Sequence, residues 1–101
     1  GEIEWNMCGI VGEISLLEGK RDDAQDYFYR AMELSKKHDA SYWAFAGAKM
    51  AVILGKRGGV DEAIHILEHI LEHQEHVEKK EHVSFAYYAL GNLLRIRGEF
   101  E

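Results

Sequence analysis

The chain has 101 residues, of which 18 are acidic, 12 are basic and 47% are hydrophobic, with one cysteine and no proline. This length fits one domain, and no uncharged apolar run of about 18 residues is present to span a bilayer. A net charge of −6 argues against nucleic acid as a partner, and a lone cysteine is typical of a reducing compartment, so we expect a cytoplasmic protein.

Helical periodicity runs through the whole chain. Apolar residues recur at spacings of three and four, and no stretch alternates with a period of two. The pattern predicts an all-α fold with five helices, and element ends read from sequence are good to about 2–4 residues. The expected helices cover residues 3–18, 22–37, 40–57, 60–77 and 83–97.

Capping residues and glycines mark the expected helix ends. Asp22 followed by Gln25 resembles a capping box at the second helix, and Asp39 or Ser41 is suited to cap the third. A glycine follows each odd-numbered helix, as expected just past a helix C-terminus, and the short connections predict antiparallel hairpins. These turn glycines are Gly19, Gly58 and Gly98.

Similar residues return every 39 to 40 positions. The turn glycines have this spacing, and so do the pairs Val11-Gly12, Met50-Ala51 and Leu90-Gly91. Small residues at positions 12, 51 and 91 predict that two helix backbones approach closely there. The second and fourth helices match as well, since Ala24 corresponds to Ala63, Phe28 to Leu67 and Ala31 to Ile70.

Two of these stretches carry a family resemblance. The pattern Tyr-x-x-Leu-Gly-x-x-Leu at residues 87–94 and Ala-x-x-x-Phe-x-x-Ala at residues 24–31 resemble the tetratricopeptide repeat. The period is longer than the family's 34 residues or so and the closing proline is absent, which leaves a HEAT-type helix pair as the alternative fold.

The resemblance implies a right-handed α–α superhelix of antiparallel hairpins. We expect a single domain over residues 1–101 that belongs to a longer array. Its repeats would cover about 5–38 and 40–77, followed by the first helix of a third repeat at about 83–101. Stopping there would leave part of the last helix uncovered, so we also expect a homodimer through that helix.

The resemblance also implies a binding groove, because the first helix of each repeat lines the concave face in this family. Shifting the register by 39 and then 40 residues brings aromatic and basic side chains of three helices together. A ligand with apolar and acidic groups would suit them, although the phenylalanines could instead pack between long helices. The expected groove residues are Asn6, Glu13, Phe45, Lys49, Val52, Lys56, Phe85, Tyr88, Asn92 and Arg95.

Some members of the family clamp the C-terminal carboxylate of a peptide with Lys and Asn. Asn92 and Arg95 suit that chemistry in the third repeat, whereas Gly9 and Glu13 occupy the matching positions in the first. We therefore expect an interaction scaffold for a protein or peptide partner. The alternative is a self-association or sensing module, tuned by pH or a metal through an exposed repeat face or the histidine-rich helix.

The histidine-rich helix contains a repeated metalloprotease-like motif. Residues 65–69 and 69–73 both read His-Ile-Leu-Glu-His and match the H-x-x-E-H signature. His65 and His73 lie about 12 Å apart on a helix, too far to share one ion with ligands at about 2.0–2.1 Å. We expect no catalytic residue, no cofactor and no dedicated metal site. The histidines are expected to form a plain solvated face, with adventitious or intermolecular metal binding at His65, His69 or His73 as the alternative. Cys8 lies on an apolar stripe and is expected to be structural.

Overall fold

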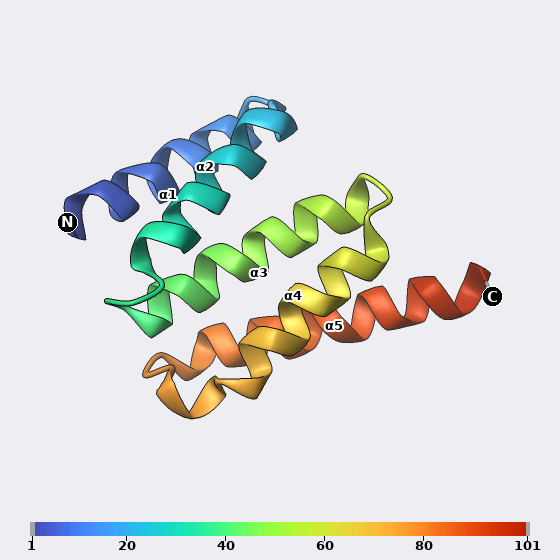
Figure 1. Ribbon diagram of the computed structural model, residues 1–101. Coiled ribbons are helices and arrows are strands. Elements are labelled where there is room, and N and C mark those ends of the chain that lie inside the picture. The colour runs from blue at the N-terminus through green and yellow to red at the C-terminus, as the bar shows by residue number, and fades with distance from the viewer. Residues whose placement is uncertain (1, 101) are drawn as a thin grey trace.

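The chain folds into five α-helices and one short 3₁₀ turn in the computed structural model, which describes residues 2–100 (Figure 1). Every regular element in this range is helical, which confirms the all-α fold class. None of these helices is both long and apolar enough to cross a membrane. The elements are α1 Glu2–Leu17, α2 Arg21–Ser35, α3 Ala40–Lys56, α4 Val60–Glu72, η1 Gln74–His76 and α5 Lys80–Phe100.

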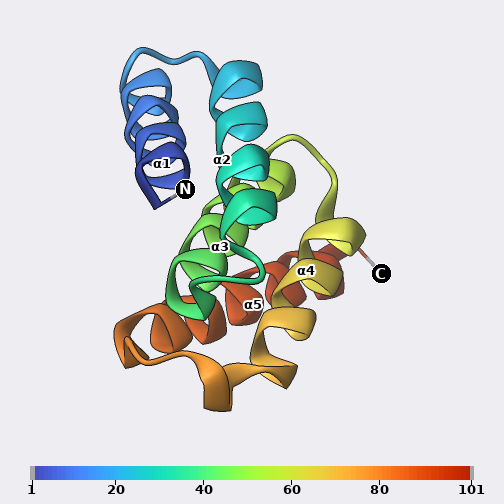
Figure 2. The same cartoon turned by 60° about the vertical axis from the view of Figure 1, so that its left-hand side comes forward.

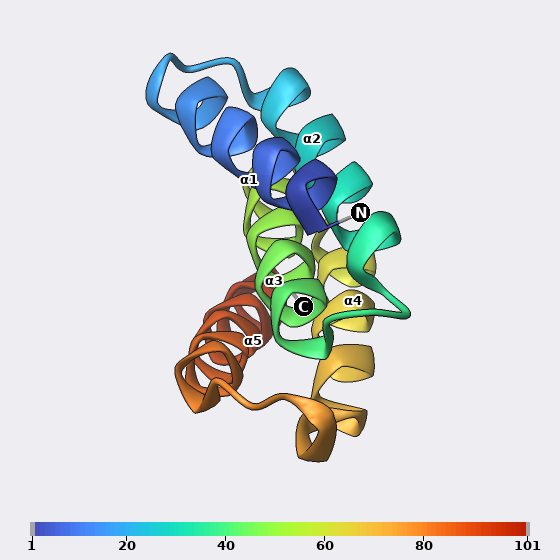
Figure 3. The same cartoon turned by 90° about the vertical axis from the view of Figure 1, so that its left-hand side faces the viewer.

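The helices stack as antiparallel hairpins. α1 and α2 run side by side in opposite directions, and each later helix packs on the one before it (Figure 2). Gly19 and Gly58 make the turns of the two hairpins with φ angles of 77° and 94°, which only glycine adopts without strain. Figure 3 shows α2 and α4 along one side of the stack and α1, α3 and α5 along the other. α3 also packs on α5.

The two hairpins bury the same positions. The three residues of α2 that recur in α4 lie in the hydrophobic core, and no member of either set is more than 1% exposed. The structure is thus consistent with a helical hairpin repeat at these positions. The matched pairs are Ala24 with Ala63, Phe28 with Leu67, and Ala31 with Ile70.

Two tryptophans fill the space near the start of each hairpin. Trp5 is buried with Ala31 and Ala46, and Trp43 joins the main core beside Leu67 and Val77. Large apolar side chains with little exposed surface contribute about 1.5–3 kcal/mol each to the stability of the fold. The tryptophans therefore anchor α1 and α3 to the rest of the stack.

The fourth helix is shorter than predicted: it ends at Glu72, whereas the sequence pattern predicted an end at residue 77. The amide of the Gln74 side chain donates to the carbonyl of Leu71 at 3.0 Å and caps the end of α4. The chain then makes the η1 turn and becomes extended at Val77, whose side chain is fully buried in the core. Burial of Val77 between α4 and α5 thus accounts for the break.

The fifth helix is longer than predicted, and two expectations for its glycines are wrong. Gly98 lies inside α5 and lacks the positive φ of the two turn glycines. An Arg95–Glu99 ion pair at 2.8 Å spans this position and supports the helix. Gly91 is exposed, and a Cβ added there would meet no atom within 4 Å, so no helix approaches it among the described residues.

The capping predictions have opposite outcomes. Asp39 caps α3, because its Oδ1 accepts a hydrogen bond of 3.0 Å from the backbone N–H of Tyr42. The capping box at Asp22 and Gln25 is wrong, since α2 begins one residue earlier and has no side-chain cap. Both side chains instead contact the guanidinium of Arg57, which follows α3.

Candidate functional site

A hollow of about 470 Å³ lies between α3 and α5. Six of the ten residues expected to line a groove line this hollow, and α3 and α5 supply all of its walls. These two helices lie on the same side of the stack (Figure 3). The six predicted residues that line it are Val52, Lys56, Phe85, Tyr88, Asn92 and Arg95.

Apolar side chains form the floor of this hollow and cations lie at its edge. Phe85 and Val52 are half-buried against the core, whereas Tyr88 is 69% exposed. Lys56 is exposed and makes no ion pair with any residue that the structure describes. Arg95 pairs with Glu99, but an exposed pair of this kind contributes little and exchanges readily for another acid.

Lys49 connects the hollow to α1. Its Nζ lies 5.8 Å from the ring centroids of both Phe45 and Phe85, and 3.2 Å from Oε1 of Glu13. The register prediction placed the two phenylalanines near each other, and the shared cation agrees with that. Glu13 neutralises Lys49, however, so this part of the surface offers no net positive charge to a ligand.

The ring of Phe45 packs against three other aromatic side chains, as a core residue does. Its ring centroid lies 6.3 Å from that of Phe28, 5.5 Å from Tyr42 and 5.3 Å from His82. Phe45 does not line the hollow. The geometry thus favours the packing alternative for Phe45, and the hollow lies closer to Phe85.

Two side chains beside Phe45 have shifted pKa values. Burial lowers the pKa of His82, and the nearby Lys79 adds to this effect while Glu81 opposes it. Burial also raises the pKa of Tyr42, whose hydroxyl lies where a Cβ of Gly9 would be. Both groups are therefore neutral at pH 7, and the contact between α1, α3 and α5 carries no charge from them.

The residues predicted on α1 do not reach the hollow. Asn6 is half-buried on α1 and is absent from the lining, and Glu13 is joined to the site only through Lys49. Four lining residues were not predicted, of which Gly55 and Leu93 are in close contact. The absence of a side chain at Gly55, in the same register as Arg95, is the sequence signal for this approach. The unpredicted lining residues are Gly55, Ala89, Leu93 and Ile96.

An apolar stripe on the outer face of α1 was also missed. Its four residues follow one another at spacings of three and four along the helix, and each side chain is between 49% and 87% exposed. On α5, Tyr87 and Leu94 are exposed while Leu90 and Ile96 are half-buried. The residues of the α1 stripe are Met7, Ile10, Ile14 and Leu17.

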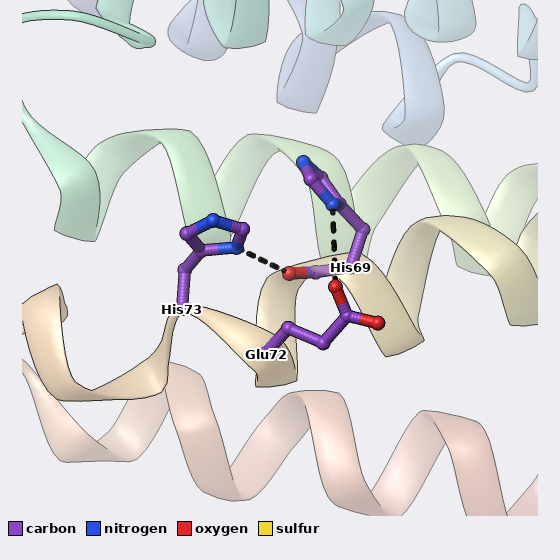
Figure 4. Close-up of side chains that lie close together, drawn as sticks. All are labelled: His69, Glu72 and His73. Carbon is purple, nitrogen blue, oxygen red and sulfur yellow. Dashed lines mark hydrogen bonds and ion pairs between the residues drawn. The ribbon is translucent and has the colours of Figure 1, made fainter.

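The three candidate surface histidines lie at α4, and all are exposed. His65 and His69 are within the helix, and His73 is its C-terminal cap residue. His69 and His73 lie close to each other and to Glu72, while His65 is not part of this group (Figure 4).

Comparisons of the chain with profiles of known protein families, with curated proteins and with solved structures find no match. The tetratricopeptide resemblance therefore stays a prediction. The stacked hairpins, the hollow between α3 and α5, the α1 stripe and the histidine group remain as the features that bear on function.

Proposed function

We propose that this chain is a protein-interaction module of the tetratricopeptide type. In this proposal the hollow between α3 and α5 binds a peptide or a helix of a partner protein. The observation that carries it is the lining, which combines an apolar floor, an exposed tyrosine and a lysine that makes no ion pair within residues 2–100. Such hollows at rigid helix surfaces suit segments that insert a few side chains.

The side chains at the hollow define the chemistry of the partner. Tyr88 is an aromatic anchor of the type that dominates affinity at interfaces, and Phe85 offers an apolar surface below it. Lys56 favours an acidic group on the ligand, and Arg95 can leave Glu99 to contact another. The fitting ligand is therefore a segment with one or two large apolar side chains next to an aspartate or glutamate.

Selection from a displayed library of random peptides tests this proposal. We expect enriched peptides to combine aromatic or large aliphatic residues with acids, and to lose binding to the Tyr88→Ala and Lys56→Glu variants. Tyr29→Ala and Lys37→Glu are the matched controls, since Tyr29 is 51% exposed on α2 and Lys37 is exposed just after it. Enriched peptides that bind all four variants equally would place the binding surface elsewhere.

Self-association is the second candidate function, and the α1 stripe favours it. Contiguous exposed apolar side chains on a helix mark interaction surfaces, and four of them lie along one face of α1. Tyr87 and Leu94 of α5 add a second exposed apolar area. In this proposal another copy of the chain covers one or both faces. Light scattering across a range of concentrations tests it, and a monomer throughout the range would exclude it.

A further inference from the structure

We propose that His69, Glu72 and His73 form a binding site for one divalent transition-metal ion, of which Zn²⁺ and Cu²⁺ are the natural probes. This inference is independent of the proposed peptide groove, because it concerns the C-terminal end of α4 and not the surface between α3 and α5. One ligand atom of each of the three side chains lies within 4.8 Å of the others (Figure 4).

The helix end supplies the spacing that a shared ion needs. Glu72 is three residues after His69 and His73 is four residues after it, the spacings that bring side chains together at a helix surface, and His73 is the cap residue that ends α4. Ligands at about 2.0–2.1 Å from a tetrahedral ion lie roughly 3.4 Å from one another. The remaining gap is small enough for slight side-chain rotations to close, and all three side chains are exposed.

The surroundings restrict the orientation of both imidazole rings. Nδ1 of His73 lies 3.0 Å from the backbone carbonyl oxygen of His69, and the tautomer that donates this hydrogen bond carries the free lone pair on Nε2. Histidine ligands of metals usually have such an outer hydrogen bond. The ring of Trp43 packs edge-on against His69 and His73, with centroid distances of 5.6 and 6.0 Å. Trp43 is only 8% exposed, so its ring is held in place by the core and limits the movement of the two imidazoles on that side.

The donor set selects the class of metal. Imidazole nitrogens suit Zn²⁺, Cu²⁺ and Ni²⁺, whereas Ca²⁺ and Mg²⁺ prefer oxygen ligands. Glu72 lies 3.9 Å from Nδ1 of His69 and adds one negative charge. His76 lines the same surface depression as both histidines and is available as a fourth ligand, while Lys36 of the neighbouring segment opposes the bound charge.

Trp43 makes the site observable. A paramagnetic Cu²⁺ ion bound between the two histidines would quench the fluorescence of the adjacent indole. The Trp5→Phe background removes the other tryptophan, which stacks on His38 at 5.8 Å and is distant in sequence from this site. In that background we expect saturable quenching by Cu²⁺ with one ion per chain, and recovery of the fluorescence when a chelator removes the ion.

Single histidine substitutions decide whether the quenching belongs to this site. His69→Ala and His73→Ala should each weaken Cu²⁺ binding by about tenfold or more. His65→Ala is the matched control, because His65 is an exposed histidine one turn earlier on α4. Circular dichroism establishes that each variant is folded. Quenching that is absent, that does not saturate, or that depends on His65 as much as on His73 would overturn the assignment.

Discussion

Gly12 of α1 lies directly against Phe28 of α2, since a Cβ at position 12 would come within 3.1 Å of the phenylalanine ring. Gly91 is in the same register of the repeat, yet it faces open space on α5. Phe28 is the α2 member of the buried pair that recurs as Leu67 in α4. A glycine is thus needed at position 12, because the second helix of that hairpin places the large side chain of Phe28 against it.

Substitutions at these two glycines should act in opposite directions. Gly12→Leu would overpack the contact with Phe28 and lower the free energy of unfolding by about 1–3 kcal/mol. Gly91→Ala adds a methyl group that meets nothing and removes a flexible residue from a helix, so it should raise stability by about 0.5–1 kcal/mol. Urea unfolding of both variants measures this. Equal destabilisation by both would mean that Gly91 also lies in a packed contact.

The cap of α3 should contribute measurably to stability. Asp39→Ala removes the acceptor for the N–H of Tyr42 and should cost about 0.5–2 kcal/mol. Asp39→Asn keeps an acceptor of similar strength and serves as the control. The thermal unfolding midpoints of the two variants should differ accordingly. A loss as large in Asp39→Asn as in Asp39→Ala would show that the charge of Asp39, and not its capping bond, is the stabilising feature.

Much of the fold follows from the sequence pattern, although the pattern of turn glycines fails at Gly98, which lies inside α5. The turns at positions 19 and 58 adopt a positive φ that favours glycine, and Phe28 and Leu67 are both buried where the hairpins pack. The end of α4 follows no such pattern. No glycine or proline lies between Glu72 and Val77, and a side-chain cap from Gln74 ends the helix there.

The candidate site was only partly predictable for a similar reason. Register placed Phe85 and Tyr88 beside α3 correctly, because that depends on the repeat period alone. It did not distinguish a groove residue from a packed one at Phe45, which requires knowing that Tyr42 and His82 surround its ring. The apolar stripe of α1 escaped prediction because that helix is apolar on its inner face as well.

The stability of the fold should depend on the ionisation of His82. Burial lowers its pKa in the folded chain below the ordinary value of about 6.5, so the unfolded chain binds the proton more tightly. The contribution of His82 is therefore fully present above about pH 6.5, and it is lost as the pH falls from there toward the folded pKa. Lys79 acts in the same direction, and Glu81 and Asp39 act against it.

A variant without this imidazole isolates the effect. Between about pH 7.5 and about pH 5, His82→Gln should lose less stability than the unmodified chain, as measured by urea unfolding at each pH. His65→Gln, at an exposed position on α4, is the control and should keep the full pH dependence. Identical pH profiles for His82→Gln and the unmodified chain would contradict the assigned role of burial.

Self-association, if the α1 stripe mediates it, should depend on two isoleucines. The double variant Ile10→Lys, Ile14→Glu leaves the net charge unchanged and places polar groups on residues that are 59% and 49% exposed. We expect it to remain monomeric in light scattering at concentrations where the unmodified chain associates. The control is the double variant Arg30→Glu, Glu33→Arg, which also leaves the net charge unchanged and alters two exposed residues of α2. Association that survives the isoleucine changes would exclude the α1 stripe as the interface.

Amide chemical-shift mapping by NMR tests the proposed groove most directly. A ¹⁵N-labelled chain is titrated with an acidic, apolar peptide enriched by the display selection. The largest shifts should fall on the residues that line the hollow, including Lys56 of α3 and Tyr88 of α5, and should vanish for Tyr88→Ala but not for Tyr29→Ala. Shifts confined to α2 and α4, or unchanged by the loss of Tyr88, would contradict binding between α3 and α5.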